Sequence, residues 1–271
     1  IVTDLRLYAS AFQPVKSARS TKATVYGSVI ADMDMAVNGP LDALKIRGNV
    51  GLLTGTEVTY VMQDSPFALQ QQENNIVTFV SFNDSTEIAE EDTLQKSSVL
   101  GMDILVNINI APTVKMGVNI SVDGKNRIDL QGGGELAYTM NTLGDSRFTG
   151  RYNLTGGFVR YNPPIISEKL FKIQDGSYVS WNGDIADPQM SITAVETVRT
   201  TISEEEKNTR QVNFDISIII KNSLENLSVS FDLSAPEDLT LQNQLTSLTA
   251  EQRASQAMSL LIYNTYTGPG T

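Results

Sequence analysis

The feature that most constrains this chain is an alternation of apolar and polar residues that persists over long stretches. Even positions from Met102 to Ile110 are apolar, the run resumes from Val114 to Val122, and similar runs lie at 212–220 and 227–233. Successive side chains of a β-strand point to opposite faces, so each run predicts a strand with one apolar face. Many such strands in succession predict a large sheet whose apolar face must roll up, pair with another sheet or hold an apolar ligand.

The composition limits the classes of function. The 271 residues are enough for one all-β domain with a sizeable core, and the start at Ile1 suggests part of a longer or processed chain. The formal net charge of -11 argues against a nucleic-acid partner and against electrostatic docking to an anionic membrane. No run of about eighteen apolar residues is present to form a spanning helix.

The chain has no Cys and no His, which further restricts its chemistry. Their absence removes disulfides, thiolate metal sites and the commonest general base. An enzyme site also needs a few precisely placed polar groups, and the sequence shows no such set. We therefore expect a protein that is not an enzyme and that has no cofactor and no metal.

The periodic segments give the expected order of elements. Strands are expected at 24–37, 44–52 and 58–62, followed by a long irregular excursion at about 63–100. The alternation then resumes at 102–122, with a tight break at Ala111-Pro112-Thr113, and continues beyond residue 127. Residues 200–210 are charged and are expected to form a solvated hairpin tip. In total we expect on the order of a dozen strands.

One amphipathic helix is expected near the C-terminus. Thr249 with Gln252 fits a capping box, and apolar residues follow at helical spacing until the helix ends near Asn264. This helix could cover an exposed sheet edge, which is slightly favoured, or bind a partner. The expected division is a β domain at 1–247 and a helix with its tail at 248–271.

Three local features each allow a structural and a functional interpretation. Gly132-Gly133-Gly134 is typical of a bend, a bulge or a close approach, with a phosphate loop as a much weaker alternative. Trp181 is more readily a packing anchor than a ligand-stacking ring. Asp175, Asp184 and Asp187 could bind a metal, but turn chemistry explains them equally well.

Residues 101–198 carry a resemblance to a known family. The segments that carry it read GMDILVNINIAPTVKM at 101–116, RIDLQGGGEL at 127–136, GRYNLTGG at 150–157, FKIQDGSYVSW at 171–181 and GDIADPQMSITA at 183–194. This order resembles the C-terminal domain of TamB, the translocation and assembly module subunit of diderm bacteria. Ile185-Ala186 departs from the pattern, because Pro would be expected sooner after Gly183-Asp184.

The resemblance implies a fold, a location and partners. Members of the family are inner-membrane-anchored periplasmic proteins whose sheet curls lengthwise into an open groove, a β-taco, with an apolar interior. Their C-terminal end meets an outer-membrane assembly barrel of the TamA and BamA kind, and related bridge-like proteins carry phospholipid acyl chains. The fold class expected here is therefore an all-β, elongated curled sheet with one C-terminal amphipathic helix. The family offers no catalytic residues to transfer.

Three hypotheses follow for the apolar face. The first is a phospholipid conduit that delivers lipid to the outer membrane. Its groove would be lined by Met102, Ile104, Val106, Ile108, Val118, Ile120, Leu130, Leu136, Tyr138, Phe148 and Ile192. The second is a scaffold that helps outer-membrane barrel proteins to insert by strand addition. Its partner-binding residues would be Leu227, Val229, Phe231, Leu233, Met258 and Leu261. The third is a closed sandwich or barrel whose apolar faces pack on each other.

Overall fold

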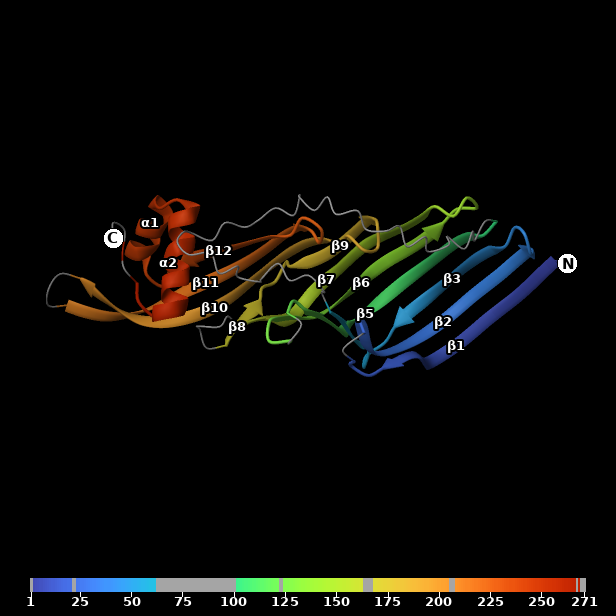
Figure 1. Ribbon diagram of the computed structural model, residues 1–271, viewed down its shortest axis with the longest axis horizontal. Coiled ribbons are helices and arrows are strands. Elements are labelled where there is room, and N and C mark those ends of the chain that lie inside the picture. The colour runs from blue at the N-terminus through green and yellow to red at the C-terminus, as the bar shows by residue number, and fades with distance from the viewer. Residues whose placement is uncertain are drawn as a thin grey trace.

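One curled sheet dominates the structure, with helices at its C-terminal end (Figure 1). The computed structural model describes residues 2–20, 23–61, 101–121, 124–162, 168–204, 208–266 and 268. Within these ranges, twelve strands form a single sheet and are followed by two helices. The strands are β1 Val2–Ser17, β2 Val25–Pro40, β3 Lys45–Leu52, β4 Glu57–Val61, β5 Asp103–Asn119, β6 Arg127–Met140, β7 Ser146–Tyr161, β8 Lys169–Ile173, β9 Tyr178–Gly183, β10 Gln189–Glu204, β11 Asn208–Ser223 and β12 Ser228–Ser234.

The sheet follows chain order almost throughout. Its order is β1-β2-β3-β5-β6-β7-β8-β10-β11-β12, with β4 pairing with β2 and β5, and β9 with β7 and β10. The short strands β3 and β4 therefore share the place between β2 and β5, and both run parallel to β5. The remaining pairs are antiparallel among the strands described, so successive strand ends alternate between two long rims.

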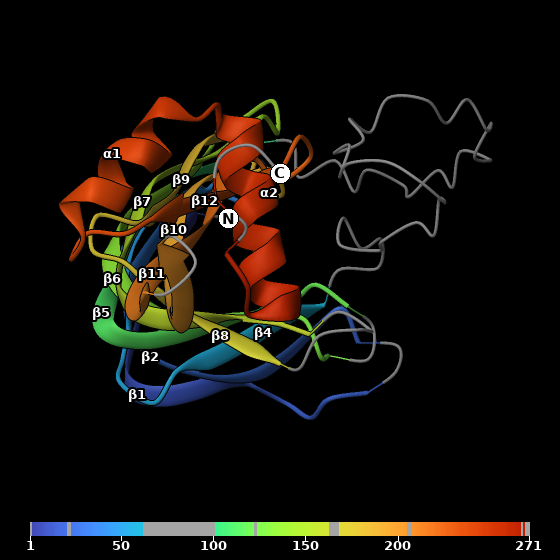
Figure 2. The same cartoon turned by 90° about the vertical axis from the view of Figure 1, so that its left-hand side faces the viewer.

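The strands bend across the sheet and give it a C-shaped cross-section. Figure 2 looks along the long axis and shows the strands passing from one rim, around a curved back, to the other rim. The opening between the rims faces the viewer of Figure 1. The expected fold class, an elongated curled sheet with a helical C-terminal end, is confirmed.

The two helices close the C-terminal end of this curl. Helix α1 spans Leu239–Ser247 and helix α2 spans Ala250–Tyr263. The predicted capping box is present at Thr249 and Gln252, and α2 ends at Asn264 in a left-handed conformation. Helix α2 packs mainly against β12 and lies across the opening in Figure 2.

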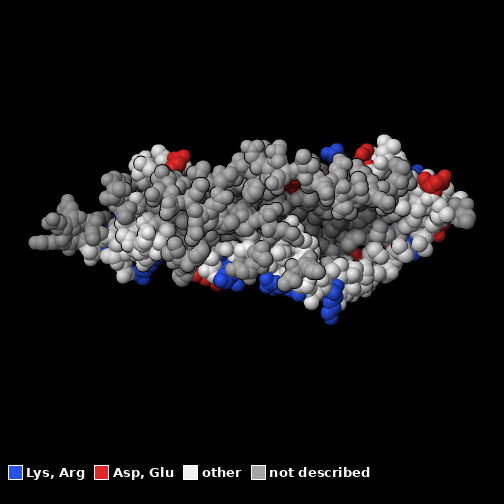
Figure 3. All heavy atoms as spheres, viewed as in Figure 1, with Lys and Arg blue, Asp and Glu red and all other residues white. Residues whose placement is uncertain are grey.

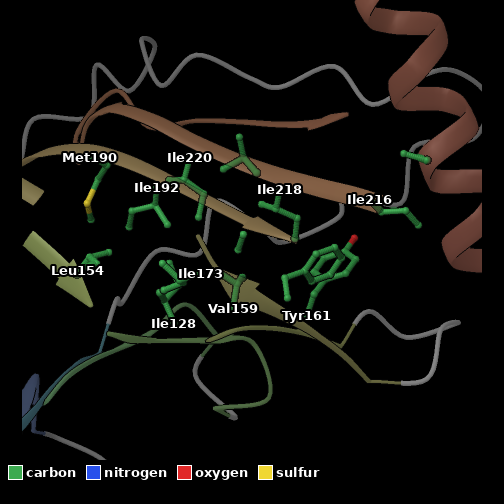
Figure 4. Packing of buried hydrophobic residues seen from close by; sticks show 14 of the residues in the cluster. Ile128, Leu154, Val159, Tyr161, Ile173, Met190, Ile192, Ile216, Ile218 and Ile220 are labelled. Carbon is green, nitrogen blue, oxygen red and sulfur yellow. The ribbon is translucent and has the colours of Figure 1, made fainter. Parts of the chain in front are cut away.

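The inner face of the sheet packs on itself in the C-terminal half. Figure 4 shows Ile218 and Ile220 of β11 opposite Val159 of β7 and Ile128 of β6. The rings of Tyr161 on β7 and Phe231 on β12 are 6.0 Å apart, although three strand positions separate these strands in the sheet order. The curl is therefore filled with side chains at this end, as in a closed core.

The triple glycine lies where β5, β6 and β7 approach each other closely. The β5–β6 register shifts between Ile110 and Val114, and the β6–β7 register shifts beside Gly132. A Cβ atom on Gly134 would fall 2.0 Å from the backbone oxygen of Arg151. The bulge and close-approach interpretation is thus confirmed. The tight break expected at Ala111-Pro112-Thr113 is wrong, because this bulge lets β5 run on as one strand.

Two elements were not expected from the sequence. Strand β1 was missed, and so was α1, which lies within the segment expected to be purely β. The hairpin at 200–210 is present as the β10–β11 pair, but its strands extend to Glu204 and resume at Asn208. The excursion expected at about 63–100 lies outside the described residues, except that it connects β4 to β5.

Candidate functional site

Direct strand pairing builds continuous apolar rows across the inner face. Directly paired residues of neighbouring strands point to the same face of a sheet. One row runs through Leu7, Met35, Gly48, Val106, Tyr138 and Phe148. The next row runs through Ala9, Met33, Val50, Ile108, Leu136 and Gly150. Both rows cross β1, β2, β3, β5, β6 and β7, so the inner face is apolar over six strands.

The outer face of the same strands is polar. The row beside Leu7 runs through Tyr8, Asp34, Asn49, Asn107, Ala137 and Thr149. Asn107 Nδ2 donates to Asn49 Oδ1 at 3.2 Å, and Arg6 pairs with Asp34 at 2.8 Å. The two faces differ because alternate residues of each strand point to opposite sides of the sheet, and the sequence alternates between apolar and polar residues.

The inner face changes from open to closed along the molecule. Ile216, Ile218 and Ile220 on β11 are fully buried, whereas Leu5 and Leu7 on β1 are 47% and 41% exposed. The inward side chains of β2 and β3 are mostly half-buried. The surface in Figure 3 is hollowed between its upper and lower edges toward the N-terminal end. An accessible apolar groove therefore lies over β1–β3 and the start of β5, and we call it the open groove.

The eleven residues predicted to line a groove fall into two groups. In the closed core are Ile120, Leu130, Leu136, Phe148 and Ile192, with Ile108, Val118 and Tyr138 packed at its margin. Val106 is buried outside that cluster, and Met102 and Ile104 are half-buried at the start of β5. Ile104 and Val106 border the open groove beside β3, as does Ile108, which pairs with Val50.

Several residues of the open groove were missing from the sequence-based list. They are Leu5, Leu7, Met33, Met35, Val37, Ile46 and Val50. The alternation of β2 and β3 was visible in the sequence, but alternation does not distinguish an accessible strand from one covered by a facing wall.

The six residues predicted to bind a partner face inward. Val229, Leu233 and Leu261 are buried in the core, and Leu227, Phe231 and Met258 pack against it. Their side chains hold β12 and α2 on the sheet. A partner approaching this end would meet the backbone of β12, which pairs only with β11 among the described strands.

Trp181 and two of the candidate metal ligands have structural contacts. The indole of Trp181 packs edge-on against Phe148 with ring centroids 5.4 Å apart, and its Nε1 donates to the backbone oxygen of Ile185. The carboxylates of Asp184 and Asp187 accept backbone N–H groups at 2.7 and 2.9 Å in turns. Across the described ranges, no three acidic side chains are gathered closely enough to hold a metal ion.

One carboxylate of β10 lies on the apolar inner face. Glu196 on β10 pairs with Ile216 on the inner face, and burial raises the pKa of its carboxyl group. Lys169 at the start of β8 opposes this shift by charge attraction. Ionised Glu196 therefore has an electrostatic cost that only Lys169 relieves.

The comparisons with known proteins agree with this architecture. The model of the TamB C-terminal domain family matches residues 1–270. A search of curated proteins found no match. In the part of the chain described, neither helix has the length and hydropathy needed to cross a membrane.

Proposed function

Because this chain belongs to the TamB C-terminal domain family, we propose that its open groove shields the acyl chains of phospholipids on their way to the outer membrane. The family supports a role in the translocation and assembly module of the bacterial envelope. The specific cargo, the docking partner and the position in the periplasm are part of the proposal.

The observation that carries the proposal is the half-exposed apolar face over β1–β3. A chain with a net charge of -11 would ordinarily bury such a surface. Each methylene of an acyl chain contributes about 0.8 kcal/mol when it leaves water, so a lipid needs no specific contact to stay there. The absence of bulky aromatic side chains from the two inner rows of β1–β3 also suits flexible chains.

The closed half has a different role in this proposal. Its two facing walls, part of which Figure 4 shows, contribute buried side chains to one continuous hydrophobic cluster. We propose that it is a rigid end piece that meets an outer-membrane assembly barrel of the TamA kind. Lipid would then enter over the N-terminal strands, supplied by an anchored upstream segment at the inner membrane, and leave near the start of the core.

A matched pair of charged variants tests the groove. Met35 points into the open groove, while Ala36 points outward between Arg6 and Arg47. We expect Met35→Glu to fold yet to lose most of the phospholipid that native mass spectrometry detects on the purified wild-type chain. Ala36→Glu adds the same charge one residue away and should retain the lipid. Equal retention in two folded variants would reject the groove as the lipid site.

A scaffold function is the second candidate, and the free edge of β12 favours it. An incoming strand could pair with the backbone of β12 and help a barrel protein to insert. Proline at Ser230 would disrupt such pairing and leave the open groove unchanged. A loss of barrel assembly in cells, with phospholipid still bound to the purified variant, would favour the scaffold over the conduit.

A further inference from the structure

Over strands β1–β9, which include those bordering the open groove, the two rims of the curled sheet carry opposite charge. The described residues of one rim lie at 16–20, 23–25, 119–121, 124–129, 158–162 and 168–172, and they include seven Lys and Arg and two Asp and Glu. We call it the basic rim. The other rim, at 2–6, 38–47, 101–105, 140–147 and 182–189, holds four Lys and Arg and six Asp and Glu, and we call it the acidic rim. Lys and Arg side chains gather along the lower edge in Figure 3.

The charges of the acidic rim are used within the protein. Asp103 pairs with Arg47 of the same rim at 2.6 Å, and Arg6 of this rim pairs with Asp34 inside β2 at 2.8 Å. Asp145 accepts from Asn141 Nδ2 at 2.8 Å inside a turn. The structural role of Asp103 and Asp145 explains why they lie at the strand ends.

The charges of the basic rim are used much less. Arg127 is engaged, since its Nε lies 2.5 Å from Asp129 Oδ1. In contrast, Lys16, Arg19 and Arg160 form no ion pair with any described residue. Arg160 lies directly across from Arg127, and its Nε is buried without a hydrogen-bond partner in the described structure. The basic rim therefore has cationic groups that the fold does not neutralise, in a chain that is acidic as a whole.

Arg19 lies beside an apolar edge of the open groove, and Lys16 lies on the outer face of the same rim, opposite Ser28. The guanidinium of Arg19 lies over Gly124, so the residues that follow β1 and those that precede β6 approach each other here. At the same strand ends, Val25 of β2 and Tyr60 of β4 pair directly on the inner face and are 49% and 41% exposed. In a phospholipid a phosphate adjoins two acyl chains. The guanidinium of Arg19 could contact the phosphate while Val25 and Tyr60 contact the acyl chains.

We propose that the basic rim binds the phosphate of phospholipids whose acyl chains lie in the open groove, and that it favours anionic over zwitterionic headgroups. This inference rests on the proposed function. The ammonium of a zwitterionic headgroup needs an acceptor, and the nearby Asp129 is already engaged by Arg127. The anionic headgroup of phosphatidylglycerol carries no ammonium, so it gains the attraction of Lys16 and Arg19 and leaves no cation without an acceptor.

The test is a competition between lipids with identical acyl chains. The purified chain is incubated with vesicles of equimolar phosphatidylglycerol and phosphatidylethanolamine, and native mass spectrometry measures the bound lipids. We expect about a three- to tenfold enrichment of phosphatidylglycerol on the wild-type chain. The variant Lys16→Glu/Arg19→Glu should hold as much lipid in total but lose the enrichment. The neutral variant Lys16→Gln/Arg19→Gln should give an intermediate ratio.

A charge-matched control makes the same change on the acidic rim. Lys45→Glu/Arg147→Glu alters the net charge equally and should keep the enrichment. If the two Glu double variants show equal enrichment, the basic rim does not bind the headgroup. The same holds if the wild-type chain binds lipid without enrichment. In both cases the groove can still be the site of the acyl chains. A wild-type chain that holds no lipid at all overturns the proposed function as well. Enrichment abolished by phosphate buffer would show a site for the free ion instead.

Discussion

The contrast between open and closed halves predicts unequal costs for truncating two inward-facing aliphatic side chains. Ile218 is fully buried on β11, paired with Ala194 and Phe231, so Ile218→Ala creates a cavity between packed walls. Such substitutions cost about 2–5 kcal/mol of unfolding free energy. Leu7 on β1 is 41% exposed, so Leu7→Ala removes less buried area and leaves no enclosed cavity. We expect a cost of about 1 kcal/mol for Leu7→Ala.

The measurement is urea unfolding followed through the emission of Trp181, the only tryptophan. Trp181 packs against Phe148 on the curled wall, so its emission should report loss of the inner packing. The dependence of unfolding free energy on urea should be the same for both variants, since the same surface is exposed on unfolding. If Leu7→Ala costs as much as Ile218→Ala, the inner face of β1 is covered in solution and the open groove does not exist.

Three further predictions concern the interior and the closing helix. Tyr152→Phe removes the hydroxyl that donates to the backbone oxygen of Val114 at 2.9 Å, so urea unfolding should show a loss of about 1–3 kcal/mol; an unchanged midpoint would show that the carbonyl finds another donor. Burial raises the pKa of Glu196 despite the opposing effect of Lys169, so the wild-type chain should lose stability as pH rises through that pKa. At neutral pH the variant Glu196→Gln should therefore be more stable than the wild-type chain. That difference in thermal midpoint should vanish below the ordinary pKa of Glu, and a variant that is less stable at neutral pH would contradict the sign. Thr249→Ala breaks the capping box and should weaken α2 by about 1 kcal/mol, seen as faster amide exchange in that helix alone.

The strand pattern was predictable where the alternation is unbroken, and β1 shows why it fails elsewhere. Its inward residues are Leu5, Leu7 and Ala9, but a register shift then brings Phe12 to the inner face. Ala11 adopts a φ of 48°, and its N–H donates to Asp32 Oδ1 at 2.7 Å. A second register shift returns the inner face to the odd position Val15, so the apolar positions change parity twice and the segment loses its two-residue period.

Helix α1 and the closure of the sheet were hidden for different reasons. The helix is short and buries only Leu241 and Leu245, a pair that gives a weak periodic signal even with Asp238 at its N-cap. Closure depends on contacts between strands that are distant in the sequence, such as Tyr161 with Phe231. Alternation is the same in β2 and β11, so the sequence identified the apolar face but not the part of it that stays accessible.

The absence of Cys from the sequence allows the most direct test of the open groove. A fluorescent label is attached to single cysteines introduced at Val50, which points into the groove, and at Asn49, which points outward. The chain is then loaded with phospholipid that carries a nitroxide on its acyl chain. The account predicts strong quenching of the label at residue 50 and little at residue 49. Equal quenching at both positions, or none at residue 50 on a lipid-loaded chain, would contradict it.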